Sequence, residues 1–190
     1  MKPKLIIING PLGSGKTTLA RAYADDHPLT LRLDIDNIWA LISGRRDEPQ
    51  ATTALAKNMA NAMAEIHLQA AHDVVVPQFY FDIEQYIEWE DLAKKCNAEL
   101  YEVYLEISKK DSIDRYIKRG QAAGNPDGFR PGSLVKRLGG IAQLEKMYDQ
   151  AKATADARPK TIRLNSRLNA IEETYSELLK ALESVNRYVA

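Results

Sequence analysis

The segment from Gly10 to Thr18 (GPLGSGKTT) constrains the fold of this chain most, because it fits the pattern G-x-x-x-x-G-K-[ST]. It follows the apolar run Leu5–Ile8, and residues 17–21 after it favour a helix. The motif requires this context of a buried strand, a glycine-rich turn and a helix. The alternative, a chance glycine-rich turn, leaves the complete motif with its correct flanks unexplained. The segment therefore predicts a loop that holds the phosphates of a nucleoside triphosphate.

The backbone of this loop is expected to supply most of the phosphate contacts. Glycine reaches conformations that are closed to other residues and brings successive N–H groups toward one centre. The positive end of the following helix adds its field there. The residues predicted to bind the nucleotide in this way are Gly10, Gly13, Ser14 and Gly15.

Three side chains of the motif are expected to reach the nucleotide as well. The Lys16 ammonium would lie between the β- and γ-phosphates, where it acts in catalysis and in binding. The Thr17 hydroxyl would ligate the Mg²⁺ ion that bridges these phosphates. Thr18 would contact the α-phosphate.

The composition limits the remaining possibilities. At 190 residues the chain suits a single domain, residues 1–190. Lys plus Arg and Asp plus Glu both number 26, so no excess of charge indicates nucleic acid or a membrane surface as a partner. One cysteine, Cys96, excludes an internal disulfide framework. Without a signal peptide or an apolar stretch of about 20 residues, we expect a cytoplasmic protein. The oligomeric state cannot be inferred.

Short apolar runs alternate with segments of helical spacing along the chain. The runs predict strands at residues 5–8, 29–33, 74–76, 100–107 and 161–164. Between and after them, helical spacing includes the apolar series Leu55, Met59, Met63, Ile66 and Ala70. This alternation implies parallel crossovers, and therefore an α/β fold with a doubly wound, five-stranded parallel sheet flanked by helices. The breaker-rich segment 120–133 is the candidate lid.

Ligands of such sheets bind at the carboxyl ends of the strands. Asp34 and Asp36 follow the second predicted strand, and Gln78 follows the third. We expect Asp36 to accept the proton of an attacking hydroxyl and Asp34 to assist the metal ion. Each aspartate could instead be the N-cap of the next helix, a position that Asp favours. Gln78 ends a buried apolar strand, so its polar side chain needs a partner, such as a ligand.

These residues resemble the small P-loop kinases, a group that includes shikimate and gluconate kinases, chloramphenicol phosphotransferase, polynucleotide kinase and zeta-toxin-like ATPases. Asp34-x-Asp36 is similar to the D-x-D of shikimate kinase, in which the second carboxylate contacts the acceptor hydroxyl and the first helps to hold magnesium. The resemblance implies a three-layer P-loop fold of the nucleoside-monophosphate-kinase type with a lid, and ATP and Mg²⁺ as cofactors.

The chain departs from this group at two places. Polynucleotide kinase has an arginine where this chain has Trp39, which argues against reading of a 3′-phosphate and against a nucleic-acid partner. Shikimate kinase has a glycine-rich segment where this chain has Pro77-Gln78-Phe79, which argues against shikimate as the acceptor. Asp73 lies at the amino end of the third strand, on the wrong edge for a metal site.

Four arginines are candidates for the closing part of the site. The resemblance suggests that Arg115 packs on the adenine and that Arg119 reaches the phosphates, as lid arginines do. A guanidinium suits both stacking and the charge of a transferring phosphoryl group. An exposed basic face paired with Asp111 and Asp114 is the alternative. Arg130 and Arg137 could close on the γ-phosphate or the acceptor, or lie on solvated surface.

The acceptor is the open part of the prediction. Aromatic residues that follow the second and third strands could line its pocket or belong to the core: Trp39, Phe79, Tyr80, Phe81 and Tyr86. We expect an ATP-dependent phosphotransferase that acts on a hydroxyl of a small molecule, bound by Asp36, Trp39, Gln78, Arg130 and Arg137. A nucleotide or polynucleotide 5′-hydroxyl kinase is one alternative. An ATP-binding switch or ATPase without a transfer acceptor is another.

Overall fold

The computed structural model describes residues 2–44, 47–79, 83–121 and 139–186. Its five strands form one sheet in the order β2-β3-β1-β4-β5, and every neighbouring pair is parallel. The strands are β1 (Lys4–Asn9), β2 (Leu31–Arg32), β3 (Val74–Pro77), β4 (Glu99–Glu106) and β5 (Ile162–Asn165). The predicted five-stranded parallel sheet is confirmed.

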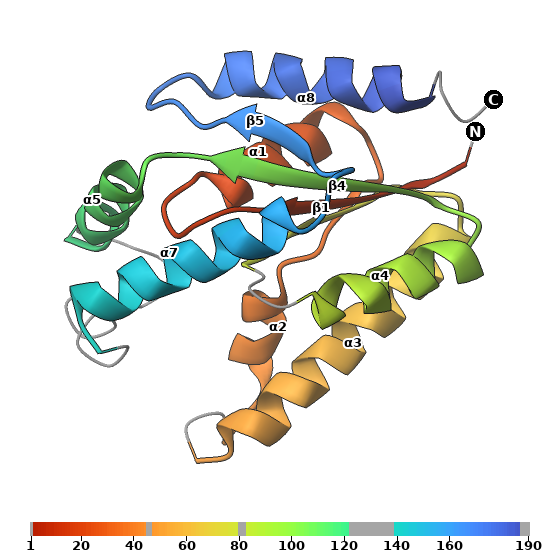
Figure 1. Ribbon diagram of the computed structural model, residues 1–190. Coiled ribbons are helices and arrows are strands. Elements are labelled where there is room, and N and C mark those ends of the chain that lie inside the picture. Colours follow the sequence, from red (N-terminus) through yellow and green to blue (C-terminus); the bar gives the residue numbers. More distant parts are fainter. Residues whose placement is uncertain (1, 45–46, 80–82, 122–138, 187–190) are drawn as a thin grey trace.

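Helices cover both faces of this sheet, which gives the three predicted layers (Figure 1). The helices of the described segments are α1 (Lys16–Asp26), α2 (Ile35–Leu41), α3 (Pro49–Gln69), α4 (Glu84–Lys95), α5 (Lys109–Gln121), α7 (Ile141–Asp156) and α8 (Ile171–Asn186). Helices α1 and α8 pack on one face, and α2, α3, α4 and α7 pack on the other. No helix in these segments is both long enough and apolar enough to cross a membrane.

Strand β1 shows why its sequence is a continuous apolar run. Ile6 and Ile8 pack against α1 and α8, whereas Leu5 and Ile7 pack against α3 and α4. All four side chains are fully buried. A central parallel strand has no solvent face, so both of its faces must be apolar.

Helix α3 exists as predicted, but the apolar series that marks it in the sequence does not face the core. Leu55, Met59, Met63 and Ile66 are 41–70% exposed. The buried side consists mainly of small residues: Thr52, Ala56, Ala60, Ala64 and Leu68. Alanine lets a helix approach its neighbours closely, and hydrophobic spacing alone does not distinguish an alanine face from an adjacent leucine and methionine face.

The second strand is shorter than predicted. Leu29 has a φ of 68°, and the Thr30 N–H donates to the His27 carbonyl, so the chain is still turning there. Pairing with β3 therefore begins only at Leu31. Of the candidate lid, residues 120 and 121 continue the backbone of α5, and residues 122–133 lie outside the described segments.

Candidate phosphate-binding site

The glycine-rich segment leaves the carboxyl end of β1 and enters α1, as its motif requires. Gly13 has a φ of 75° and Gly15, the N-cap of α1, a φ of 92°. A Cβ atom at Gly13 would lie 2.7 Å from the Ser112 carbonyl oxygen, whereas one at Gly15 would meet nothing within 4 Å. Gly13 is therefore needed for close packing against α5, and Gly15 for a left-handed turn beside open space.

Buried polar groups fix the start of this loop. Asn9 is fully buried, and its Oδ1 accepts a hydrogen bond of 2.7 Å from the Gly10 N–H. Its Nδ2 donates to the Tyr86 hydroxyl at 2.6 Å. The Arg158 guanidinium stacks over the Tyr86 ring at 4.7 Å and is itself bound by Glu90 and Glu102. This network anchors the loop to helix α4.

The Lys16 ammonium is held inside the loop. It donates to the carbonyls of Gly10 at 2.8 Å and Pro11 at 2.9 Å, and it lies 5.7 Å from the Phe79 ring centroid. Burial, and secondarily the Arg119 charge, lower the pKa of Lys16 to about 7, while Asp36 and Asp34 act in the opposite direction. The charges of Asp36 and Arg119, two of the predicted catalytic residues, thus act on the third, Lys16.

Both aspartates lie at the start of α2, close to the loop. Asp34 is the N-cap of this helix, and its Oδ1 accepts a 3.1 Å hydrogen bond from the Asp36 N–H. The capping alternative is therefore correct for Asp34, and it does not prevent the carboxylate from acting on Lys16. Asp36, in the first turn, is exposed. Its carboxylate also raises the pKa of Tyr116, although burial has the larger effect.

Arg115 and Arg119 lie on α5, which packs against the phosphate loop. Arg115 donates to the Ser166 hydroxyl at 3.1 Å and to its carbonyl at 3.4 Å, rather than forming the alternative pairs with Asp111 and Asp114. Those two carboxylates instead accept hydrogen bonds from Ser108 and Lys110. The Ser166 hydroxyl donates to the Ser14 carbonyl at 2.7 Å. Arg115 therefore contacts the phosphate loop through Ser166.

The predicted acceptor residues are only partly described. Trp39 is half-buried and donates from Nε1 to the Thr52 hydroxyl at 3.2 Å, which joins α2 to α3. The Gln78 N–H donates to the Ile8 carbonyl and extends the pairing of β3 with β1. Tyr86 is 1% exposed and belongs to the core. Tyr80, Phe81, Arg130 and Arg137 lie outside the described residues.

The described residues fit a bound triphosphate and Mg²⁺. The Ser14 hydroxyl is buried without a hydrogen-bond partner in this part of the chain, and such groups normally have one. It lies in the loop whose glycine backbone faces open space at Gly15. Thr17 and Asp34 offer hard oxygen ligands of the kind that Mg²⁺ prefers beside phosphate oxygens. These two residues would hold the ion.

Sequence reasoning missed several residues of this site. Asn9 anchors the loop by its hydrogen bond to Tyr86, which the sequence offered only as a pocket or core residue. Ser112 donates to the Leu12 carbonyl at 2.6 Å, and Ser166 joins the loop to Arg115. Tyr116 lies near Asp36 and Arg119. Asn9 and Ser166 had a usable signal, because each closely follows a predicted strand at the edge of the sheet where ligands bind.

Comparisons with known proteins agree with this geometry. A family model for the AAA domain matches residues 5–130. No curated protein sequence matches the chain. A gluconokinase structure from Sinorhizobium meliloti 1021 is 16% identical, with a TM-score of 0.60 over 98% of this chain and 97% of that chain.

Two further solved structures are similar in fold. A variant of the APS kinase CysC from Mycobacterium tuberculosis is 18% identical, with a TM-score of 0.53 over 96% of this chain and 98% of that chain. A chain of the Pnkp1/Rnl/Hen1 RNA repair complex is 19% identical, with a TM-score of 0.60 over 83% of this chain and 47% of that chain. At these identities the likeness shows the fold alone. Since the family model covers more than half of the sequence, this chain belongs to the AAA domain family, with the fold of the small P-loop kinases.

Proposed function

We propose that this chain is an ATP-dependent phosphotransferase that acts on a hydroxyl group of a small-molecule acceptor. The observation that supports the proposal is that the charges of Asp36 and Arg119 both act on the Lys16 ammonium of a complete phosphate loop. A phosphate-binding loop alone is compatible with many activities. A carboxylate and a guanidinium beside its lysine supply the base and the extra positive charge that phosphoryl transfer to an alcohol needs.

The proposed reaction uses these groups in one in-line step. The acceptor oxygen forms a bond to the γ-phosphorus of ATP as its proton passes to the Asp36 carboxylate, and the bond from phosphorus to the β,γ-bridging oxygen breaks to release ADP. Lys16 and Arg119 stabilise negative charge on the transferred group and on the leaving phosphate. Mg²⁺, when bound, would neutralise charge on the β- and γ-phosphates. Arg115 is the proposed contact of the adenine.

Matched substitutions of the two aspartates test the assignment. ADP release is measured with a panel of sugars, sugar acids, nucleosides and antibiotics, and then repeated with Asp36→Asn and Asp34→Asn. We expect Asp36→Asn to retain ADP binding and to lower transfer by about 100-fold or more, because the proton has no acceptor. Asp34→Asn should instead raise the Mg²⁺ concentration needed for half-maximal rate. Unchanged turnover in Asp36→Asn would remove this carboxylate from the mechanism.

The same assay, with a 5′-hydroxyl oligonucleotide added to the panel, separates the other two candidate functions. A 5′-hydroxyl oligonucleotide and nucleosides test the nucleotide or polynucleotide kinase, for which the likeness to the RNA repair complex is the supporting observation. ADP release that does not depend on any acceptor supports the switch or ATPase. Saturable stimulation by a small alcohol, with phosphate recovered on that alcohol, supports the proposed phosphotransferase.

A further inference from the structure

Helix α3 presents an exposed face that carries no charge. The helix has 21 residues, and every charged residue in it lies outside its exposed positions. The exposed apolar side chains follow one another at helical spacing: Ala51, Leu55, Met59, Ala62, Met63 and Ile66. We call these residues the neutral face of α3. The four large ones are 41–70% exposed, and the helix lies along the lower edge of the molecule (Figure 1).

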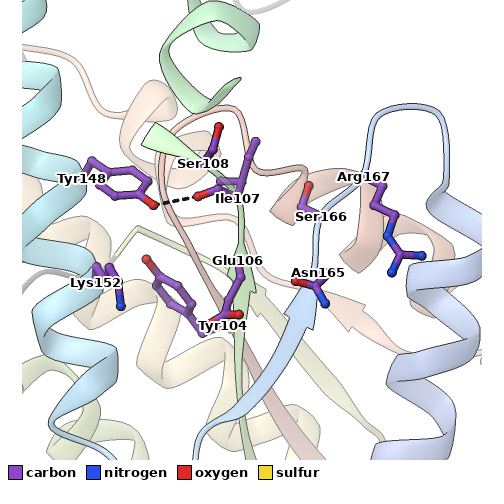
Figure 2. A pocket seen from close by; sticks show the side chains of 9 residues that line it. All are labelled: Tyr104, Glu106, Ile107, Ser108, Tyr148, Lys152, Asn165, Ser166 and Arg167. Atoms are coloured by element: carbon purple, nitrogen blue, oxygen red, sulfur yellow. Dashed lines mark hydrogen bonds between the residues drawn. The ribbon is translucent and has the colours of Figure 1, made fainter. Parts of the chain in front are cut away.

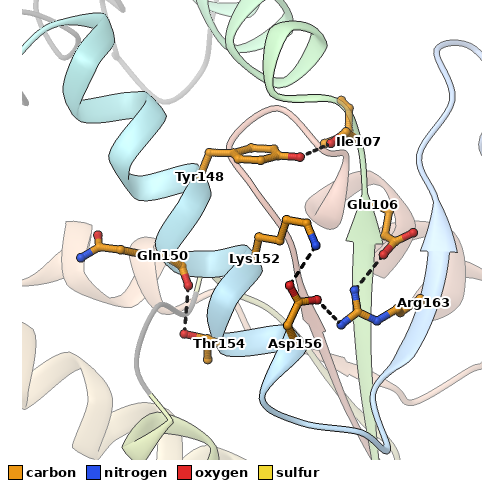
Figure 3. Close-up of polar contacts among 8 residues, drawn as sticks. All are labelled: Glu106, Ile107, Tyr148, Gln150, Lys152, Thr154, Asp156 and Arg163. Atoms are coloured by element: carbon orange, nitrogen blue, oxygen red, sulfur yellow. Dashed lines mark hydrogen bonds and ion pairs between the residues drawn. The ribbon is translucent and has the colours of Figure 1, made fainter.

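Other surfaces of the described chain differ from the neutral face in charge. Charged side chains line the cavity at the carboxyl ends of β4 and β5 (Figure 2). Beside it on α7, Lys152 pairs with Asp156, which also pairs with Arg163 of β5 (Figure 3). Each of the other described helices also exposes at least one charged residue. A face that is depleted of charge and rich in methionine has the composition of the core of a protein interface.

The distribution of charge indicates which partner fits this face. Lys57 and Glu65 of α3 are only partly exposed, and Glu65 is held by Lys95 of α4 at 2.6 Å. An identical face therefore brings no like charge against the neutral face. The chain as a whole adds no repulsion between copies, since Lys plus Arg and Asp plus Glu both number 26. With a single lysine and no arginine, α3 has no basic fringe to attract an anionic membrane.

We propose that the neutral face is the interface of a homodimer, in which α3 of a second copy packs antiparallel on it. The twofold axis passes between residues 60 and 61. Leu55 then faces Ile66 of the second copy, and Met59 faces Met63 of the second copy, so that large apolar side chains meet along the contact. Ala62 of each copy lies beside the axis, where its small side chain lets the two helices approach closely.

The acidic start of α3 favours the antiparallel direction. Asp47 and Glu48 immediately precede the helix, and both are exposed. In a parallel pair the carboxylates of both copies would lie together and repel. Antiparallel packing places them at opposite ends of a helix about 30 Å long, well beyond the screening length of about 8 Å at physiological salt. The dipoles of the two helices also oppose each other in this arrangement.

The size of the neutral face sets the expected affinity. The helix is about 30 Å long and about 10 Å wide, so the two copies together remove on the order of 1,000 Å² from water, near the lower limit for a specific interface. We therefore expect a reversible dimer with a dissociation constant on the order of 10–100 µM, and a monomer with an exposed face at about 1 µM. The dimer does not depend on the proposed function, because neither the phosphate loop nor Asp36 belongs to the neutral face.

Sedimentation velocity of the full chain without nucleotide tests the proposal. Between about 1 and 300 µM the mass should rise from that of one chain to that of two and stop there. A mass of one chain over the whole range, or growth beyond two chains, would overturn the proposal. A chain that stays monomeric and instead binds neutral phosphatidylcholine vesicles would assign the face to a lipid surface, which also overturns it.

A charge placed beside the axis assigns the dimer to this face. Ala62→Glu should raise the dissociation constant at least tenfold, because it brings two like charges together. Its melting temperature at about 1 µM should stay unchanged, because Ala62 is exposed in the monomer. Ala142→Glu, the same change at an exposed position of α7, is the matched control and should dimerise normally. Normal dimerisation of Ala62→Glu would exclude the neutral face as the interface.

A mixing experiment tests the twofold symmetry itself. Ala62→Lys should also fail to dimerise alone. An equimolar mixture of the Ala62→Glu and Ala62→Lys variants should form dimers again, because opposite charges then face each other across the axis. A variant that had simply misfolded would not be rescued in this way. A mixture that stays monomeric would contradict the antiparallel contact at Ala62.

Discussion

Burial within its own loop, rather than any single charged neighbour, decides the protonation of Lys16. The folded chain lowers the pKa of this lysine from 10.5 to about 7, and burial is the largest cause. Between these two values the unfolded chain binds more protons than the folded chain. The contribution of Lys16 to the free energy of unfolding therefore rises with pH across this window. Bound phosphates raise the pKa of Lys16 again, because they favour the charged ammonium.

Nucleotide binding should consequently take up a proton above neutral pH. Between pH 7 and 9 we expect the affinity for ADP to fall by up to about tenfold per pH unit. Calorimetric titration at pH 8.5 in two buffers of different ionisation enthalpy measures the proton directly. Lys16→Arg, which keeps its charge throughout, is the control. Identical binding heats in the two buffers would contradict the prediction.

A buried hydrogen bond between the side chains of Asn9 and Tyr86 holds the start of the phosphate loop. Tyr86→Phe removes the hydroxyl that accepts from Asn9 and should cost about 1–3 kcal/mol of stability, since both groups are buried. It should also weaken ADP binding, because Asn9 fixes the first N–H of the loop. Urea unfolding and calorimetry provide the two measurements.

Tyr175→Phe is the matched control for Tyr86→Phe. It removes a hydrogen bond from a phenol to the exposed Asp26, on the sheet face covered by α1 and α8. We expect a smaller loss of stability and unchanged ADP affinity. Equal effects of the two substitutions on ADP binding would show that Tyr86 does not position the loop.

Among the elements, α3 is the helix whose packing differs most from its sequence pattern. Its small buried residues sit against α2, α4 and the sheet, while its larger apolar residues face outward. Its three buried alanines are fully enclosed, so a larger side chain at one of these positions would have to displace its neighbours.

Substitutions on the two faces of α3 should therefore differ in how much they destabilise the fold. Ala60→Leu places a larger side chain at a fully buried position and should destabilise the fold by about 1–3 kcal/mol. Met59→Leu, at a neighbouring position that is 46% exposed, should change stability by no more than about 0.5 kcal/mol. Urea unfolding of the two variants checks both values. A larger loss in Met59→Leu would mean that the stripe is buried in solution.

At the scale of the whole molecule, one sheet links all parts of the candidate site. The phosphate loop follows β1, the aspartates follow β2, and α5 with its two arginines follows β4. Since these strands are joined in a single sheet, we propose that residues 1–190 fold as one unit.

One cooperative unfolding transition is the expected consequence. A non-hydrolysable ATP analogue with Mg²⁺, at about 100 times its dissociation constant, should stabilise the folded chain by about 2.7 kcal/mol. For a chain of this length the corresponding rise in melting temperature is about 5–10 °C. Scanning calorimetry with and without the ligand measures both. Two separate transitions, of which only one responds to the ligand, would contradict a single domain.

Features of the site that depend on neighbouring residues could be predicted from the sequence. The phosphate loop was identified because its glycines, lysine and threonine are contiguous, and the strand-and-helix alternation identified the parallel sheet. Asp34 and Asp36 followed from their position after a predicted strand, and Arg119 from the resemblance to the lid arginines of small P-loop kinases. Ser112 and Tyr116 could not be assigned, because no local motif marks them and the groups near them, the Leu12 carbonyl and the Asp36 carboxylate, lie far away in sequence.

The sequence by itself thus determined the local chemistry, a loop with the donors to hold phosphates between a buried strand and a helix. Only the tertiary structure decided which face of α3 is buried, since alanine and leucine are both apolar and the choice depends on interhelical distance. It also decided the contact of Arg115 with Ser166, 51 residues away, and of Ser166 with Ser14, 152 residues away. Such pairs form because parallel strands bring their carboxyl ends to one edge of the sheet, whatever their separation along the chain.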